Sequence, residues 1–488
     1  MKRTAQLLLM LVWLGTMAAE AQIPSQIQYP NPFKHIILMV QENRTPDNLF
    51  HGLLNWAGAN PAKYDIATSG INSKGHKIPL APVPLGNVYD LDHSHAAFEA
   101  MYDKGKMDGG NKIGCSPTSG PCPAYPQFKY VENQNHILDP YLTLATQYGW
   151  ANFMFQTNQG PSYPAHQFLF GGTSAFSKGG DADGVFVSGN PDAKKGPSYA
   201  AGHTGCLAPL SEWNWLIHPD GSQTQLNNDP LGTLCFSHDT MASLLDFAGI
   251  TWRYYSLRAN GGLSDPGGSI FTAPNSIRDI CDPNSDYTKC TGAEWADNVD
   301  LTPSDVLRDI RACKLKEVSW VIPTGQNSDH PGSPSNIGGP SWVASVVNAI
   351  GNDTNCEHGH GYWSDTAIVI TWDDWGGWYD HEAPTILPGS QGGYQYGFRV
   401  PLLAVSAYTP SAYVDNERHD FGSILRFIEG VFGIKEGSLG FADARSKTDL
   451  HGFFNFRQKP RKFQTIEAPL DADFFINDTT LPLPPDND

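Results

Sequence analysis

The chain has 488 residues, of which 40% are hydrophobic and 17% are charged, an ordinary globular composition that argues against disorder over most of its length. Its 49 glycines and 37 prolines indicate many loops and long connections on a rigid framework. The formal net charge of -18 argues against a nucleic-acid partner, because neutralising phosphates requires clustered Lys and Arg.

The N-terminus has the three parts of an export signal. Lys2 and Arg3 form a basic start, residues 7–14 are apolar, and Ala19-Glu20-Ala21 is a small-residue cleavage sequence. We therefore predict that residues 1–21 are a signal peptide and that the protein is exported, either to the periplasm or out of the cell. No later segment approaches the roughly eighteen uninterrupted apolar residues of a membrane span, so none is expected.

The cysteines fit an exported protein. Their number is even, 8, and no CxxC sequence occurs, which favours disulfides over a zinc ribbon. Neighbours in sequence predict two local disulfides, and the other two pairs follow by elimination. The expected pairs are Cys115/Cys122, Cys281/Cys290, Cys206/Cys235 and Cys313/Cys356.

Polar residues follow the first predicted strand. The apolar run at residues 35–40 predicts a central strand, and Glu42 and Asn43 come directly after it. Thr45-Pro46 then offers an N-cap and a proline at the first helical position, which predicts a short helix. Glu42 and Asn43 alone could equally form a simple turn.

Ser162 lies where a second strand gives way to a helix. Residues 152–155 are predicted as the strand, and Gly160-Pro161-Ser162 as a tight turn that begins a helix ending at Gly171-Gly172. A helix N-terminus presents free N–H groups to an anion. Taken alone, Ser162 could instead be a helix cap.

A third strand, at residues 367–371, precedes the most acidic motif. Asp373-Asp374 follows it directly, and Asp380-His381 comes after two glycines. Adjacent carboxylates are unfavourable unless a cation or a proton lies between them, and ligands bind at this edge of α/β sheets. The motif predicts a metal site; the alternative is an Asp-Asp turn in an aromatic loop.

The remaining pattern alternates strands with helices, which predicts an α/β fold with a mainly parallel central sheet covered on both faces. Residues 174–233 and 261–301 are expected to be loop-rich insertions, and residues 471–488 a Pro-rich acidic tail that does not pack. Further strands are predicted at 250–255, 318–322 and 400–405, and helices at 136–148, 241–247, 341–350 and 421–432.

The three strand ends together supply a set of oxygen ligands. Carboxylate, amide and hydroxyl oxygens suit Mg²⁺, Ca²⁺ or Mn²⁺, and carboxylates also hold Zn²⁺. A serine hydroxyl on such a cation has a lowered pKa and is a better nucleophile. The predicted metal ligands are Glu42, Asn43, Ser162, Asp373 and Asp374.

Histidines in polar loops extend this set. His93 and His330 lie where imidazoles would donate to phosphate oxygens or protonate a leaving group. His95, His166 and His419 are interpreted as hydrogen-bonded surface groups. The sequence assigns no function to His95, His166, Asp380 or His381.

Several motifs, in order over roughly residues 35–430, resemble the bacterial phosphoesterase family of phosphatidylcholine-type phospholipases C and AcpA-like acid phosphatases. The resemblance implies an alkaline-phosphatase-like core and phosphate-ester hydrolysis through a covalent phosphoserine on Ser162, with His93 and His330 assisting. Two departures are Asp374 in place of the common Glu, and Thr45 in place of Ser. The motifs are Glu42-Asn43-Arg44-Thr45, Asp92-His93 with Lys106-Met107-Asp108-Gly109, Gly160-Pro161-Ser162, Val318-Ser319-Trp320 with Asp329-His330-Pro331, and residues 373–381.

Three functions remain open. Phospholipase C activity on phosphodiester lipids is favoured, since exposed tryptophans would seat lipid or choline, although such tryptophans are more often core. An acid phosphatase acting on phosphomonoesters is the alternative, and a non-catalytic exported binding protein is a third. The sequence does not determine the oligomeric state. The tryptophans concerned are Trp213, Trp215, Trp372, Trp375 and Trp378.

Overall fold

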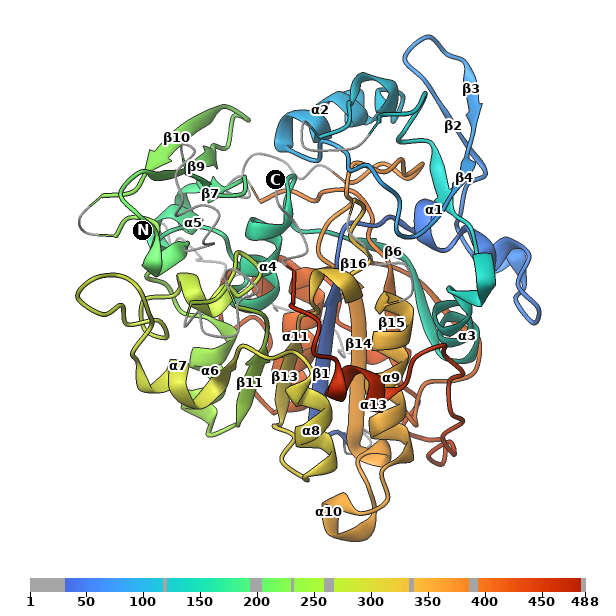
Figure 1. Ribbon diagram of the computed structural model, residues 1–488, viewed down its shortest axis with the longest axis vertical. Coiled ribbons are helices and arrows are strands. Elements are labelled where there is room, and N and C mark those ends of the chain that lie inside the picture. Colours follow the sequence, from blue (N-terminus) through green and yellow to red (C-terminus); the bar gives the residue numbers. More distant parts are fainter. Residues whose placement is uncertain are drawn as a thin grey trace, which may run out of the picture.

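An eight-stranded sheet runs through the centre of the protein (Figure 1). The computed structural model describes residues 31–116, 121–193, 204–229, 232–258, 267–332, 338–385 and 394–483, so the predicted signal peptide lies outside the described residues. In spatial order the strands are β12 (Val299–Asp300), β11 (Trp252–Tyr255), β13 (Val318–Val321), β1 (His35–Gln41), β14 (Thr366–Trp372), β15 (Leu402–Val405), β6 (Gly149–Phe155) and β16 (Tyr413–Asp420).

The sheet is mainly parallel, as predicted. Only β15 runs antiparallel to its two neighbours. Every residue of β1 and β14 is buried, as expected for strands covered on both faces. Gln41 pairs with Trp372 at the ends of these two strands. The residues that follow, Glu42 and Asp373, therefore emerge side by side at one edge of the sheet.

Helices cover both faces of the sheet. In Figure 1, α8, α9 and α13 lie in front of the sheet and α11 lies behind it. Trp320 Nε1 of β13 donates to Leu169 O of α4 at 3.2 Å, which fixes α4 against the sheet. In one group α9 (Gly338–Asn352) contacts α3 (Asp139–Gln147), α8 (Asp305–Arg311) and α13 (Ala472–Asn477). In the other, α4 (Ser162–Gly171) contacts α6 (Met241–Ala248) and α11 (Phe421–Val431), and α11 contacts α12 (Ala442–Arg445).

The two expected insertions contain more regular structure than predicted. Residues 174–233 include a small antiparallel sheet, at the upper left of Figure 1, and residues 261–301 include β12 at the edge of the central sheet. Three of these strands have only two residues each, and the longest one buries the polar residues Glu212 and Asn214, so no apolar periodicity predicts them. The first insertion holds α5 (Lys178–Asp183), β7 (Phe186–Val187), β8 (Asp192–Ala193), β9 (Glu212–Ile217) and β10 (Gln223–Asn227); the second holds α7 (Ala293–Asn298).

Smaller elements surround the edge where the site lies. The loop after β1 leads into α1, as Thr45-Pro46 predicted: the Thr45 side chain accepts from the N–H of Asn48. The other small elements near this edge are α2 and two further strand pairs. One more short helix lies far from the site. Their bounds are α1 (Pro46–Leu49), α2 (His95–Tyr102), β2 (Ser69–Ile71), β3 (Lys77–Pro79), β4 (Ala81–Val83), β5 (Lys129–Val131) and α10 (Cys356–Gly359).

The acidic tail packs, contrary to expectation, over its described part. Phe475 of α13 is buried with its ring 5.3 Å from that of Trp342 on α9. The Gly325 N–H donates to Leu483 O at 2.7 Å. The tail's composition is polar, and Phe474, Leu481 and Leu483 remain exposed, but burial of the one large ring of Phe475 holds α13 against α9. The remainder, residues 484–488, lies outside the described residues.

All four predicted disulfides are present: Cys115–Cys122, Cys206–Cys235, Cys281–Cys290 and Cys313–Cys356. They use all the cysteines of the chain. Among the helices that the structure describes, none has both the length and the apolar character needed to cross a bilayer.

Candidate functional site

Three segments that are distant in sequence meet at one edge of the sheet. Glu42 and Asn43 follow β1, Asp373 and Asp374 follow β14, and Ser162 opens α4 beyond β6. All five side chains are buried. The fold therefore brings together every residue predicted as a metal ligand, because the carboxyl ends of neighbouring parallel strands lie at the same edge.

Backbone N–H groups hold Asp373 in place. Its Oδ1 accepts from the N–H of Asn43 at 3.0 Å and from the N–H of Asp374 at 2.7 Å. Asn43 has a φ of 60°, and Gly376 lies so close that a Cβ on it would be 2.4 Å from Asn43 O. The glycine of the acidic motif is thus required for the close approach of the two strand exits.

Ser162 is directly bonded to the acidic motif. Its hydroxyl donates to Asp374 Oδ2 at 3.0 Å, and Asp374 Oδ1 accepts from the N–H of Gly376 at 2.7 Å. Burial, followed by the charge of neighbouring Asp373, raises the pKa of Asp374 well above its ordinary value. A divalent cation between the two carboxylates would relieve both effects.

The donors fit a hard divalent cation. Asp373 Oδ2 and Asn43 Oδ1 are buried and make no hydrogen bond with any residue that the structure describes. Buried oxygens without partners are costly unless a cation binds them. With the Ser162 hydroxyl and the carboxylates of Asp374 and Glu42, they form the mixed oxygen set that Mg²⁺, Ca²⁺ and Mn²⁺ take.

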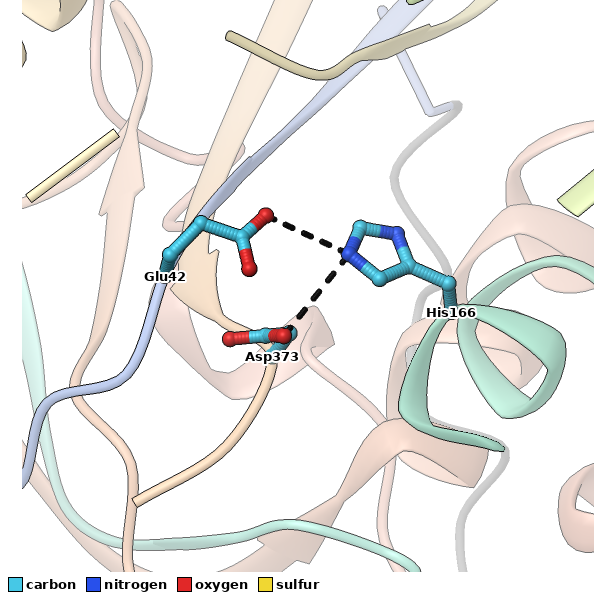
Figure 2. Close-up of side chains that lie close together, drawn as sticks. All are labelled: Glu42, His166 and Asp373. Atoms are coloured by element: carbon cyan, nitrogen blue, oxygen red, sulfur yellow. Dashed lines mark hydrogen bonds and ion pairs between the residues drawn. The ribbon is translucent and has the colours of Figure 1, made fainter. Parts of the chain in front are cut away.

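His166 belongs to this site, and its interpretation as a surface group is wrong. Figure 2 shows its imidazole facing two of the carboxylates: Nε2 lies 3.3 Å from Glu42 Oε1 and 3.7 Å from Asp373 Oδ2. Burial lowers the pKa of His166 to about 4, although Asp373 opposes this shift. The ring is therefore neutral at pH 7, the form that can bind a metal. Its position one helical turn beyond Ser162 was the available signal.

His93 orients Asn43. A carbonyl can only accept, so the contact of His93 Nδ1 with Leu91 O at 2.7 Å places the ring proton on Nδ1. Nε2 then accepts from Asn43 Nδ2 at 3.2 Å. With its NH₂ group held in this way, the Asn43 amide keeps Oδ1 as a buried oxygen without a hydrogen bond among the described residues. The predicted His93 thus contacts the site directly.

His330 lies beside His93, with the two ring centroids 6.4 Å apart. Its Nδ1 donates to Pro331 O at 2.6 Å, which leaves Nε2 as the nitrogen that exchanges a proton. Both histidines are buried. The structure therefore brings His330 to the border of the site by way of His93.

The other predicted surface groups and aromatic platforms are mostly core. His95 is buried and donates to Gln159 O at 3.0 Å, which fixes the turn before Ser162. His419 is also buried, and its Nδ1 contacts Thr448 Oγ1 at 2.9 Å. Surface placement was wrong for both, because each imidazole closes a contact between distant segments.

The tryptophans differ in exposure. Trp215 is 41% exposed and Trp213 is half-buried, whereas the three tryptophans of the acidic motif are fully buried: Trp372, Trp375 and Trp378.

His381 lies in a second charged cluster behind the acidic motif. Its Nδ1 contacts Asp47 Oδ2 at 2.8 Å, and its Nε2 contacts Asp65 Oδ1 at 3.3 Å. Burial alone would lower the pKa of His381, but hydrogen bonds to both carboxylates and the charges of Asp47 and Asp380 outweigh it and raise the pKa to about 10. His381 is thus a permanent cation at neutral pH.

This protonation makes stability depend on pH. The contribution of His381 is complete below pH 6.5, where the unfolded chain also binds the proton, and is lost as the pH rises through about 10. We expect wild type to lose roughly 2 to 4 kcal/mol relative to His381→Gln over that interval. Free energies of unfolding in urea at pH 6.5, 8 and 9.5 measure it; parallel pH profiles for the two proteins would contradict it.

Comparison with known proteins identifies the family of this chain. The model of the phosphoesterase family matches residues 33–435. Phospholipase C B of Mycobacterium tuberculosis strain CDC 1551 is 23% identical over 466 residues, which cover 88% of this chain and 78% of that protein. The non-hemolytic phospholipase C of Pseudomonas aeruginosa is 22% identical over 493 residues, covering 91% of this chain and 62% of that protein.

Solved structures are more distant. A protein in the alkaline phosphatase superfamily from Vibrio parahaemolyticus is 12% identical and superposes with a TM-score of 0.34, covering 85% of this chain and 70% of that chain.

The family match spans far more than half of the sequence and confirms the expectation of an enzyme that acts on phosphoric ester bonds. The chain belongs to the phosphoesterase family.

Proposed function

We propose that the protein is an exported, metal-dependent phosphoesterase of the phospholipase C type, which hydrolyses phosphodiester lipids through a phosphoserine on Ser162. The observation that carries the proposal is the bond from the Ser162 hydroxyl to Asp374, at the point where three strand exits meet. Relatives named phospholipase C over most of the chain support the lipid substrate. The disulfides support export, since they persist in oxidising compartments.

The metal site comprises Glu42, Asn43, Ser162, Asp373 and Asp374 in this proposal. A bound divalent cation would lower the pKa of the serine hydroxyl and neutralise charge on the phosphate. His166 is a further candidate ligand, because its Nε2 faces Glu42 and Asp373. This nitrogen donates to Glu42 Oε1 at 3.3 Å, so the ring proton would move to Nδ1 for Nε2 to bind a cation. An imidazole beside carboxylates favours Mn²⁺ or Zn²⁺ over Ca²⁺ and Mg²⁺.

Ser162 performs the first chemical step. Its Oγ forms a bond to phosphorus as the bond from phosphorus to the leaving oxygen breaks on the opposite side. The hydroxyl proton passes to Asp374 Oδ2, which already accepts it at 3.0 Å. The leaving oxygen takes a proton from Nε2 of His330 in its imidazolium form, since Nδ1–H is held by Pro331 O. Water then attacks phosphorus: His330 Nε2 takes one of its protons, and the departing Ser162 oxygen regains its own proton from Asp374 Oδ2.

The histidines and the helix stabilise charge in this scheme. His330 lies beside His93, and an imidazolium N–H at its Nε2 would donate to the phosphoryl group. His93, whose Nδ1–H is bonded to Leu91 O, acts by holding the Asn43 amide. Ser162 is the first residue of α4, so the positive end of the helix dipole lies at the same region. The N–H of Tyr163 is bonded to Asn190 Oδ1 and Pro164 has none, so the helix acts through its dipole. These groups favour the phosphoryl transition state over the ground state because they are fixed before reaction begins.

The substrate class is tested by comparing kcat/KM for phosphatidylcholine in mixed micelles with kcat/KM for p-nitrophenyl phosphate, with metal supplied. We expect phosphatidylcholine to be preferred by about tenfold or more, a difference of only about 1.4 kcal/mol in transition-state binding. Release of phosphorylcholine identifies the bond cleaved. A preference for the soluble monoester would instead identify an acid phosphatase.

A further inference from the structure

One buried guanidinium contacts all three segments that carry the site. The side chain of Arg399, just before β15, is fully enclosed. Its Nε and Nη2 donate to the two carboxylate oxygens of Asp380 at 2.8 and 3.0 Å. Its Nη1 donates to Asn152 O of β6 at 2.8 Å, and Nη2 lies 3.5 Å from Asp47 Oδ1 of α1.

Each of these partners lies on the same segment as a proposed ligand. Asp47 belongs to the helix that follows Glu42, β6 leads to Ser162, and Asp380 closes the motif that begins at Asp373. A change in the position of the guanidinium would therefore shift all three strand exits relative to one another.

Two shorter contacts join the same segments nearer the site. Thr45 Oγ1 donates to Tyr379 O at 3.0 Å, between the first and third segments. The N–H of Trp375 donates to Gln156 Oε1 at 3.2 Å, between the third and second. The three segments thus form one connected hydrogen-bonded unit, in which Arg399 is the member that reaches all three.

The cluster around Arg399 is not a second metal site. Asp47, Asp380 and His381 lie close enough together to hold an ion. However, Arg399 already makes a bidentate pair with Asp380, and protonated His381 already neutralises Asp47. A metal would have to displace two cations that are held by several hydrogen bonds each. The guanidinium does here what a structural metal does elsewhere.

We propose that Arg399 is a positioning residue, which holds the exits of β1, β6 and β14 in the arrangement that lets Glu42, Ser162 and Asp373 share one cation. The inference rests on the proposed function. Arginine is required because its planar fork donates in several fixed directions, whereas a lysine ammonium is a compact charge on a flexible stem.

The test compares Arg399→Lys with Arg253→Lys in the full-length, disulfide-bonded protein. Arg253 of β11 is the control, because its partly buried side chain pairs with Asp309 of α8 at 2.9 Å, away from the site. After EDTA treatment and dialysis, Mn²⁺ binding is measured by calorimetry, and kcat, KM and Tm are then measured with Mn²⁺ added. We expect Arg399→Lys to weaken Mn²⁺ binding by about tenfold or more and to lower kcat more than it changes KM. Arg253→Lys should leave these values unchanged.

If Arg399 had a purely structural function, Arg399→Lys would lower Tm, but the Mn²⁺ affinity and kcat of the folded protein would match those of Arg253→Lys. That result would overturn the inference.

If Arg399→Lys does not fold, Asp65→Asn replaces it. Asp65 is partly exposed and accepts from Arg399 Nη1 at 3.1 Å. We then expect Asp65→Asn to weaken Mn²⁺ binding by about threefold. Unchanged Mn²⁺ affinity and kcat in this variant would reject the inference. Wild type that binds no Mn²⁺ would instead reject the proposed metal site itself.

Discussion

Ser162→Ala is expected to lower kcat by about 10⁴-fold or more on any phosphate ester, because the substitution removes the atom that attacks phosphorus. The protein should remain folded. The change deletes one buried hydrogen bond, to Asp374, at a cost of about 1 kcal/mol. Activity on p-nitrophenyl phosphate and phosphatidylcholine, with circular dichroism of the same preparation, measures both outcomes.

A matched control separates the loss of the nucleophile from the loss of a buried hydroxyl. Ser406 is equally buried, follows β15 at the opposite edge of the sheet, and accepts a hydrogen bond from the N–H of Tyr408. Ser406→Ala should retain kcat within about twofold, as substitutions away from the reacting groups usually do. If Ser162→Ala retained activity comparable to that of Ser406→Ala, the phosphoserine mechanism would be wrong.

The second large effect, on metal affinity and kcat, is expected for Asp373→Asn. The amide oxygen can accept the two backbone N–H groups that Oδ1 now accepts, so the fold should be preserved. The amide nitrogen then replaces Oδ2, the buried oxygen that faces His166. We expect metal affinity to fall by about 100-fold or more, and kcat to fall with it, since a donor cannot bind a cation.

Metal removal should reverse which of wild type and Asp373→Asn is the more stable. In EDTA, wild type carries Glu42, Asp373 and Asp374 close together without a cation, so Asp373→Asn should be the more stable by on the order of 1 kcal/mol. With metal added, wild type should be the more stable. Denaturant unfolding with and without Mn²⁺ measures both. A non-catalytic binding protein would show no metal-dependent hydrolysis at all.

The control for this prediction is Asp415→Asn. Asp415, Glu417 and His419 also lie close enough together to hold an ion, but they are on the edge strand β16, which β15 and β6 separate from β14. This substitution should leave activity unchanged. If it abolished metal-dependent turnover while Asp373→Asn did not, the catalytic metal would have been assigned to the wrong cluster.

The central strands and their exits could be predicted because their signals are local. Residues 35–40 and 367–371 are continuous apolar runs, and β1 and β14 are buried over their full length. Polar residues directly after such runs must emerge at the sheet edge, which placed Glu42 and Asp373 correctly. In contrast, β16 is an edge strand whose outward side chains are polar, so its sequence lacks an apolar pattern.

The rest of the site depends on contacts between distant segments. His166 faces Glu42 and Asp373 only because α4 packs back against the exits of β1 and β14. Likewise, Arg399 joins Asp47 and Asp380, which no local pattern connects. Single histidines and arginines in a sequence are usually solvated, so burial could not be expected from composition or periodicity.

The most direct test of the shared cation is anomalous diffraction from crystals grown with Mn²⁺. We expect one strong peak within about 2.0–2.6 Å of oxygens from Ser162, Asp373 and Asp374, with Glu42, Asn43 and His166 around it. Density confined to Asp415, Glu417 and His419, or a Mn²⁺-bound protein without a peak beside Ser162, would contradict the proposed site.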